Sequence, residues 1–75
     1  MTNNRNDKLL KQFGLHLKKC RQKRGFSQES LAFEADVPVS QIGRIERGEV
    51  NTTLSTLNLL AGALKISMKE LVDIQ

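Results

Sequence analysis

The sequence predicts an all-α domain, a compact five-helix bundle, on three observations. Apolar residues recur at helical spacing, capping residues and glycines bound each of these stretches, and the connections between them are short. The chain has 75 residues, which is enough for one hydrophobic core and too few for two. We expect a disordered tail at residues 1–6 and a single domain over residues 7–75.

The first predicted helix runs from about Asp7 to Arg24. Its apolar stripe consists of Leu9/Leu10, Phe13, Leu17 and Cys20. Gly14 lies inside this helix, where glycine costs about 1 kcal/mol relative to alanine. A close crossing with another helix would explain Gly14, and so would simple tolerance.

The next two helices form a pair with a tight turn between them. Ser27 is a suitable N-cap for a helix over residues 28–35, and Pro38 suits the first position of a third helix over residues 38–47. A short helix braced by a first helix, with an uncommitted polar face, has the shape that reads the DNA major groove.

Two further helices complete the prediction. Thr53 or Thr52 can cap a helix over residues 54–64. The Ser-Met-Lys-Glu sequence at residues 67–70 is a capping-box pattern that begins a short final helix.

The net charge of +4 hides an asymmetry along the chain. Residues 1–24 contain eight basic residues and one acidic residue, a net charge of +7, whereas residues 25–75 contain four and seven, a net charge of −3. A basic segment of this kind attracts a phosphate backbone, although a solvated helix face is the simpler interpretation of any single lysine. A membrane-surface role for the first helix is weaker, because its apolar stripe is better used in the core.

Other functional classes find little support. The single cysteine, Cys20, cannot form an internal disulfide or supply a zinc site alone, and we expect it in the core. The single histidine, His16, lies among lysines, where we expect a solvated side chain. No catalytic arrangement, metal-spaced cluster, phosphate loop, membrane span or signal peptide is apparent in the sequence. We therefore expect no enzyme, metal, cofactor or membrane partner, and a cytoplasmic location fits best.

A series of small, apolar and polar residues extends from the first predicted helix to the last: Gly14, Leu17, Cys20, Arg21, Ser27, Gln28, Glu29, Leu31, Ala32, Val37, Ile42, Arg44, Ile45, Glu46, Arg47, Gly48, Asn51, Thr56, Leu57, Ala61, Ala63, Leu64, Ile66 and Ser67. Their order and spacing resemble the helix-turn-helix domains of the Xre and phage-repressor (Cro/C1-type) class over residues 14–72. The resemblance implies a lambda-repressor-like fold and a sequence-specific transcriptional regulator, most simply a repressor, that binds double-stranded DNA. A phage repressor, a restriction–modification controller and a housekeeping regulator fit the residues equally.

The resemblance also implies which residues contact DNA. The start of the third helix enters the major groove, where Arg44 can donate two hydrogen bonds to guanine O6 and N7. Val39 can pack on a thymine methyl group, Ser40 discriminates weakly between bases, and the exposed Gly43 leaves a gap beside them. Candidate phosphate contacts, at helix N-termini, on the third helix and in the loop after it, are Ser27, Gln28, Gln41, Arg47, Asn51 and Thr52.

Two structural features follow from the same resemblance. Asp36 stands where related domains usually have a glycine with positive φ, a conformation that aspartate tolerates better than most residues. Arg21 and Glu46 match an ion pair that joins the first and third helices in related repressors; the alternative is two unrelated surface charges.

We expect a homodimer on an inverted-repeat operator, with half-sites about one helical turn, roughly 34 Å, apart. The interface candidates are Ile66, Met68, Leu71 and Ile74, although Leu71 is also a core candidate. We expect Phe33 to fold back on the first helix, against Leu9, Leu10 and Phe13; a contact with a protein partner is the alternative. The competing function is that of an antitoxin or adaptor that uses this fold mainly for protein–protein interaction.

Overall fold

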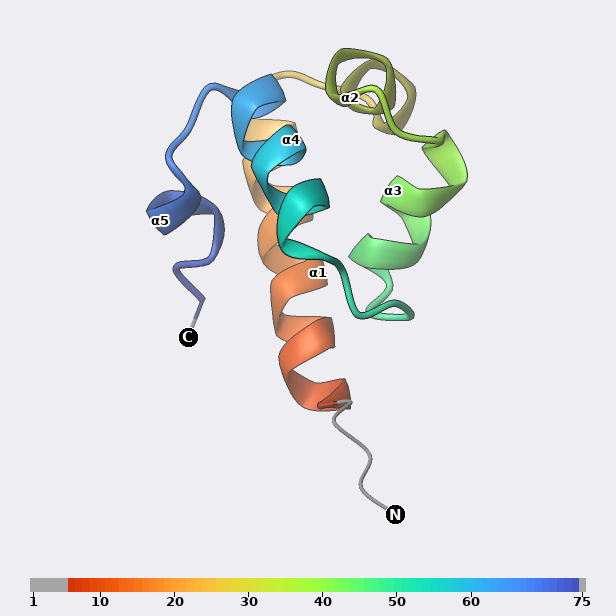
Figure 1. Cartoon of the computed structure of the whole chain (residues 1–75), viewed down its shortest axis with the longest axis vertical. Coiled ribbons are helices and arrows are strands. Elements are labelled where there is room, and N and C mark those ends of the chain that lie inside the picture. Colours follow the sequence, from red (N-terminus) through yellow and green to blue (C-terminus); the bar gives the residue numbers. More distant parts are fainter. Residues whose placement is uncertain (1–5, 75) are drawn as a thin grey trace.

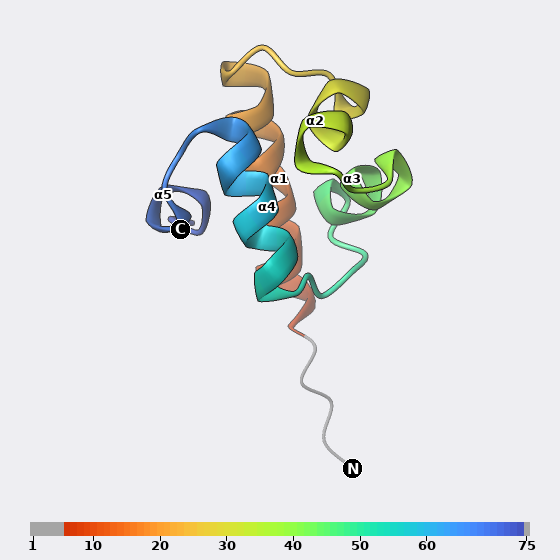
Figure 2. The ribbon, with the colours of Figure 1, turned by 45° about the horizontal axis from the view of Figure 1, so that its top comes forward.

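The computed structural model describes residues 6–74 and is all-helical over that range, which confirms the predicted fold class. The helices are α1 (Asp7–Lys23), α2 (Gln28–Ala35), α3 (Val39–Glu46), α4 (Leu54–Leu64) and α5 (Met68–Leu71). In Figure 1 and Figure 2, α1 and α4 occupy the middle of the molecule, with α2 and α3 on one side and α5 on the other. None of the described helices is long and apolar enough to cross a membrane.

Side-chain caps define where most of the helices begin. The hydroxyls of Ser27, Thr53 and Ser67 each accept a hydrogen bond from a backbone N–H in the first turn of α2, α4 and α5. These predicted caps are confirmed, with Thr53 rather than Thr52 at the start of α4. Pro38 is the N-cap of α3 and not its first residue.

The tail predicted at residues 1–6 lies outside the described residues, except for Asn6. The Oδ1 atom of Asn6 accepts a hydrogen bond from the Leu9 backbone N–H at 3.1 Å and so caps α1. Asparagine is among the best N-cap residues, because its short side chain reaches the unpaired N–H groups of the first turn. Asn6 therefore belongs to the folded domain.

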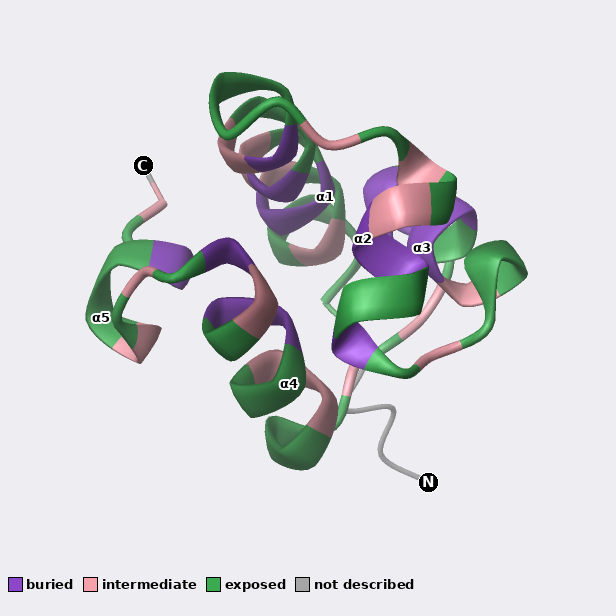
Figure 3. Ribbon diagram, turned by 90° about the horizontal axis from the view of Figure 1, so that it is seen from above, coloured by how far each residue is buried: buried purple, intermediate pink, exposed green. Residues whose placement is uncertain are grey.

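One mainly aliphatic cluster joins the helices. Its buried members come from every helix: Phe13, Leu17, Leu31, Ala32, Ala35, Ile42, Ile45, Leu60, Ala61, Leu64 and Leu71. α3 contacts both α1 and α2, and α4 contacts both α2 and α5. The buried segments in Figure 3 lie on the helix sides that face this shared core. The helix-turn-helix pair is consequently fixed from two directions.

The turn between α2 and α3 contains the predicted left-handed residue. Asp36 has φ 58° and ψ 46°, and its backbone N–H donates to the Ala32 carbonyl oxygen. A Cβ in this conformation crowds the backbone, so the turn is formed at some cost in strain.

Replacing Asp36 by glycine is expected to raise the free energy of unfolding by about 1 kcal/mol, because glycine adopts the left-handed conformation without that crowding. Urea unfolding followed by circular dichroism measures the change. Lys65, with φ 57° at the end of α4, is the matched position, and its change to glycine should have the same sign. A loss of stability in Asp36→Gly would contradict the turn described here.

The predicted packing of Phe33 against α1 is wrong. The Phe33 side chain is 84% exposed on the outer side of α2. Leu31 and Ala35, two residues before and after it, are buried, and a step of two residues turns a helix by about 200°. Phe33 therefore points away from the core that holds its neighbours.

His16 ties α5 to α1 and is not simply solvated as predicted. Its Nε2 atom lies 2.9 Å from the Glu70 carbonyl oxygen, an acceptor, so the imidazole is the donor. The Cys20 sulfur is 3.6 Å from the same nitrogen. Burial raises the pKa of the Cys20 thiol, which keeps it protonated and a weak nucleophile at neutral pH. Cys20 is thus partly buried against the core, as predicted, and His16 joins α1 to α5.

Candidate DNA-binding interface

One side of α3 is buried and the other faces solvent. Ile42 and Ile45 are 0% and 1% exposed and anchor the helix to the core. Ser40 and Arg44, four residues apart on one side of the helix, are exposed, and Val39 is exposed at its first position. The three predicted base-contacting residues are therefore all accessible on a helix that Ile42 and Ile45 anchor to the core.

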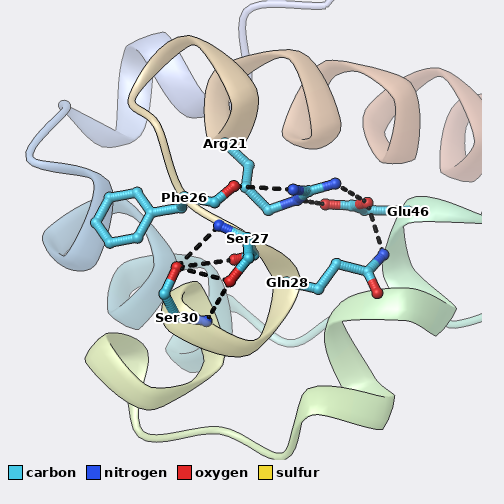
Figure 4. A network of polar contacts seen from close by, with 6 residues as sticks. All are labelled: Arg21, Phe26, Ser27, Gln28, Ser30 and Glu46. Atoms are coloured by element: carbon cyan, nitrogen blue, oxygen red, sulfur yellow. Dashed lines mark hydrogen bonds and ion pairs between the residues drawn. The ribbon is translucent and has the colours of Figure 1, made fainter.

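A buried polar network fixes α3 relative to α1 and α2 (Figure 4). Arg21 Nε donates to Glu46 Oε2 at 2.6 Å, and Arg21 Nη2 donates to Oε1 at 3.0 Å, which makes a two-point ion pair. Gln28 Nε2 donates to the same Oε1 atom at 3.0 Å. Arg21 Nη1 also donates to the Phe26 carbonyl oxygen at 2.9 Å. The predicted Arg21–Glu46 pair is present and connects three elements of the site.

The network mainly sets the orientation of α3 and adds little to the stability of the protein. The side chains of Arg21 and Glu46 are only 9% and 4% exposed. The hydrogen bond with Glu46 raises the pKa of Arg21, so the guanidinium keeps its charge inside the protein. Buried pairs of this kind add little net stability but are costly to break, which makes the orientation of α3 hard to change. Gln28, held by Glu46 at the start of α2, braces the recognition helix.

Three of the predicted phosphate contacts meet in a hollow at the beginning of α3. Gln41, Asn51 and Thr52 line it beside Arg44 and Ser40. The Thr52 hydroxyl oxygen is buried there without a hydrogen-bond partner among the described residues. The amide and hydroxyl groups around this hollow suit the oxygen atoms of a phosphate.

Arg47 is held by an exposed ion pair just after α3. Its Nε donates to Glu49 Oε2 at 2.7 Å and its Nη2 donates to Oε1 at 3.3 Å, and the hydrogen bond raises the pKa of Arg47. The Nη1 atom lies 3.0 Å from the point where a Cβ on Gly43 would be. The open gap predicted at Gly43 is therefore wrong: Gly43 is buried, because the Arg47 side chain covers it.

Ser27 is engaged as a helix cap. Its hydroxyl accepts a hydrogen bond from the Ser30 N–H at 3.0 Å and donates to the Ser30 hydroxyl at 3.0 Å. The Ser27 N–H donates to the same hydroxyl at 2.8 Å. These bonds occupy both donors of Ser27 within α2, so it is the phosphate candidate with the least geometric support.

The basic residues of α1 and its C-cap are divided between the side of α1 next to α3 and the side next to α5. Lys11 lies against Gly48, just after α3. A hollow beside α5 is instead lined by Lys19, Lys23 and Arg24. α5 and α3 lie on opposite sides of α1 (Figure 1). Only part of the positive charge can therefore act next to the recognition helix, a division that composition alone does not reveal.

The predicted dimer contacts are more buried than expected. Ile66, Met68 and Ile74 pack partly against the core. Leu71 is fully buried and anchors α5 to the core, which confirms the core alternative for this residue and leaves it unavailable to an interface. Leu15, which lies outside the predicted apolar stripe of α1, is 62% exposed and lines a hollow together with Ile74.

Comparison with known proteins agrees with this geometry. A family model described as helix-turn-helix matches residues 17–71. The control protein C.BamHI of Bacillus amyloliquefaciens is 40% identical over 62 residues, covering 81% of this chain and 76% of that protein. The immunity repressor of Bacillus phage phi105 is 39% identical over 59 residues, covering 79% of this chain and 41% of the repressor.

Solved structures of controller proteins also resemble this chain. The restriction–modification controller protein C.AhdI from Aeromonas hydrophila superposes with a TM-score of 0.81 at 41% identity, covering 88% of this chain and 98% of C.AhdI. The controller C.Esp1396I bound to a 25 base pair operator site superposes with a TM-score of 0.73 at 34% identity, covering 79% and 78%. The chain belongs to the helix-turn-helix family of Cro/C1-type, DNA-binding transcriptional regulators.

Proposed function

We propose that this protein is a controller-type regulator of a restriction–modification system that binds an inverted-repeat operator as a homodimer. The observation that carries the proposal is the helix α3, on which Val39, Ser40 and Arg44 are exposed and which a buried ion pair holds to α1. The similarity to C.AhdI and C.BamHI over most of their lengths supports the controller role. The operator complex of C.Esp1396I supports the use of this fold on DNA.

In this proposal α3 lies in the major groove and Arg44 is the main base-reading residue. Its guanidinium donates to guanine O6 and N7, while Val39, 44% exposed, packs on a thymine methyl group. The phosphate contacts come from Gln28, Gln41, Arg47, Asn51 and Thr52. Because one residue carries most of the base recognition, dimer spacing and DNA shape supply the rest of the specificity.

The dimer is proposed to form through apolar residues on the α5 side, where Ile66, Met68 and Ile74 remain partly exposed and Leu15 is 62% exposed. A two-fold dimer places its recognition helices roughly 34 Å apart, on successive turns of one face of the duplex. Light scattering on the free protein and on its DNA complex gives the number of chains in each.

Selection of bound duplexes from random DNA, repeated at two salt concentrations, tests the proposed function. We expect an enriched inverted repeat and an affinity that falls steeply with salt, because several phosphates are neutralised. Enrichment of no motif would instead favour the adaptor or antitoxin function. The exposed Phe33 is the observation that keeps that second function open.

Arg44→Ala is expected to cost about 1–3 kcal/mol of binding free energy on the selected operator and to relax specificity at one base position. The measurement is a binding titration against the operator and its single-base variants. Arg24→Ala is the matched control, because it removes the same charge from the side of α1 that faces α5. An equal loss on all sequences would reassign Arg44 to the DNA backbone.

A further inference from the structure

We infer that Gly43 is a positioning residue: it leaves the space in which the Arg47 side chain lies across α3, ready to contact a phosphate. The inference rests on the proposed function, because it explains how one of the proposed phosphate contacts is set. Gly43 is thus not a gap in the recognition surface but the place that Arg47 occupies.

The geometry assigns each nitrogen of Arg47 a different surrounding. Nε and Nη2 donate to the two carboxylate oxygens of Glu49. Nη1 is the nitrogen above Gly43, 3.0 Å from the position of a Cβ. The Gln28 Oε1 atom lies 3.8 Å from the same position. The guanidinium is therefore stretched from Glu49 toward the start of α2, where Gln28 is also held.

The surroundings of Gly43 explain why a glycine occurs inside this helix. Gly14 faces backbone atoms of another helix, but the atoms nearest to Gly43 all belong to the side chains of Arg47 and Gln28. A glycine in a helix interior lowers stability, so this position sacrifices some helix propensity. What it gains is space for the Arg47 side chain to lie along α3 before DNA binds, which reduces the ordering cost of binding.

A larger residue at position 43 must displace the guanidinium. Residues 43 and 47 are four apart and so lie on the same face of α3, one turn from each other. A leucine at 43 fills the space that Nη1 now occupies. Arg47 then has to take another rotamer, and its phosphate contact is lost or must be rebuilt.

The test is a double-mutant cycle of Gly43→Leu and Arg47→Ala, measured by titration on the selected operator duplex and on a scrambled duplex of equal length. Gly43→Leu should weaken binding to both duplexes about tenfold, the effect of losing one charged hydrogen bond. Its melting temperature should not fall below that of the unmodified protein. In the Arg47→Ala background the same change should leave the affinity unaltered. Gly62→Leu, in a helix but with nothing near its Cβ position, is the control and should bind normally.

Each other outcome contradicts the inference in a distinct way. An equal loss in the Arg47→Ala background would mean that the leucine itself clashes with DNA. Full affinity in Gly43→Leu would mean that the position of Arg47 does not matter. Failure of the unmodified protein to bind either duplex would overturn the proposed function, and this inference with it.

Discussion

Replacement of Glu46 by alanine is expected to lower the free energy of unfolding by about 3–5 kcal/mol. The Arg21 guanidinium, with its side chain only 9% exposed, would remain charged without its carboxylate partner. Gln28 would lose its acceptor at the same time. Urea unfolding followed by circular dichroism measures the loss, and DNA titration of the protein that remains folded measures how far α3 has lost its orientation.

Glu49→Ala is the matched control for that change. Glu49 also forms a two-point pair with an arginine, Arg47, but the two side chains are 51% and 60% exposed. Water screens such a pair and solvates either partner alone, so the stability should be nearly unchanged. Similar losses in Glu46→Ala and Glu49→Ala would show that burial of the Arg21–Glu46 pair is not the source of the effect.

Gly14→Ala is expected to destabilise the protein by about 3 kcal/mol, the upper part of the usual range for overpacking. A Cβ on Gly14 would overlap the Ile45 carbonyl oxygen and lie 2.5 Å from the Glu46 carbonyl oxygen. Backbone atoms cannot turn aside as the end of a side chain can, so α1 and α3 would have to separate. The melting temperature and the urea midpoint both report this loss.

Gly62→Ala, in contrast to Gly14→Ala, is expected to stabilise the protein. Gly62 lies inside α4, and a Cβ there would meet nothing within 4 Å. The change should therefore stabilise the protein by about 0.5–1 kcal/mol, the normal helix preference of alanine over glycine. If Gly14→Ala were tolerated as well as Gly62→Ala, the close crossing of α1 and α3 would be refuted.

Local signals predicted most of the helix limits. α2 and α4 begin and end where capping residues and apolar spacing placed them, and Asp36 has the left-handed conformation expected of it. These features depend on contacts within a few residues of the chain, which the sequence presents directly. The Arg21–Glu46 pair was accessible only through the family resemblance, because its partners are 25 residues apart.

The errors share a different cause. Phe33 and Gly43 each have surroundings that differ from the predicted ones, although the helices that carry them were predicted correctly. The surroundings of each depend on where other helices or a neighbouring long side chain lie. For Gly43 the deciding neighbour was Arg47, whose flexible side chain could have pointed in several directions.

The sequence by itself determined that this protein is a five-helix, helix-turn-helix domain with Val39, Ser40 and Arg44 on the recognition helix. Periodicity, caps and motif order carry that information, because they act within or between adjacent helices. Only the tertiary structure decided which basic residues lie beside α3, which atoms surround Gly14 and Gly43, and how Glu46 holds α3 in place. Those properties arise where atoms from distant parts of the chain meet, and their distances exist only after the helices have packed.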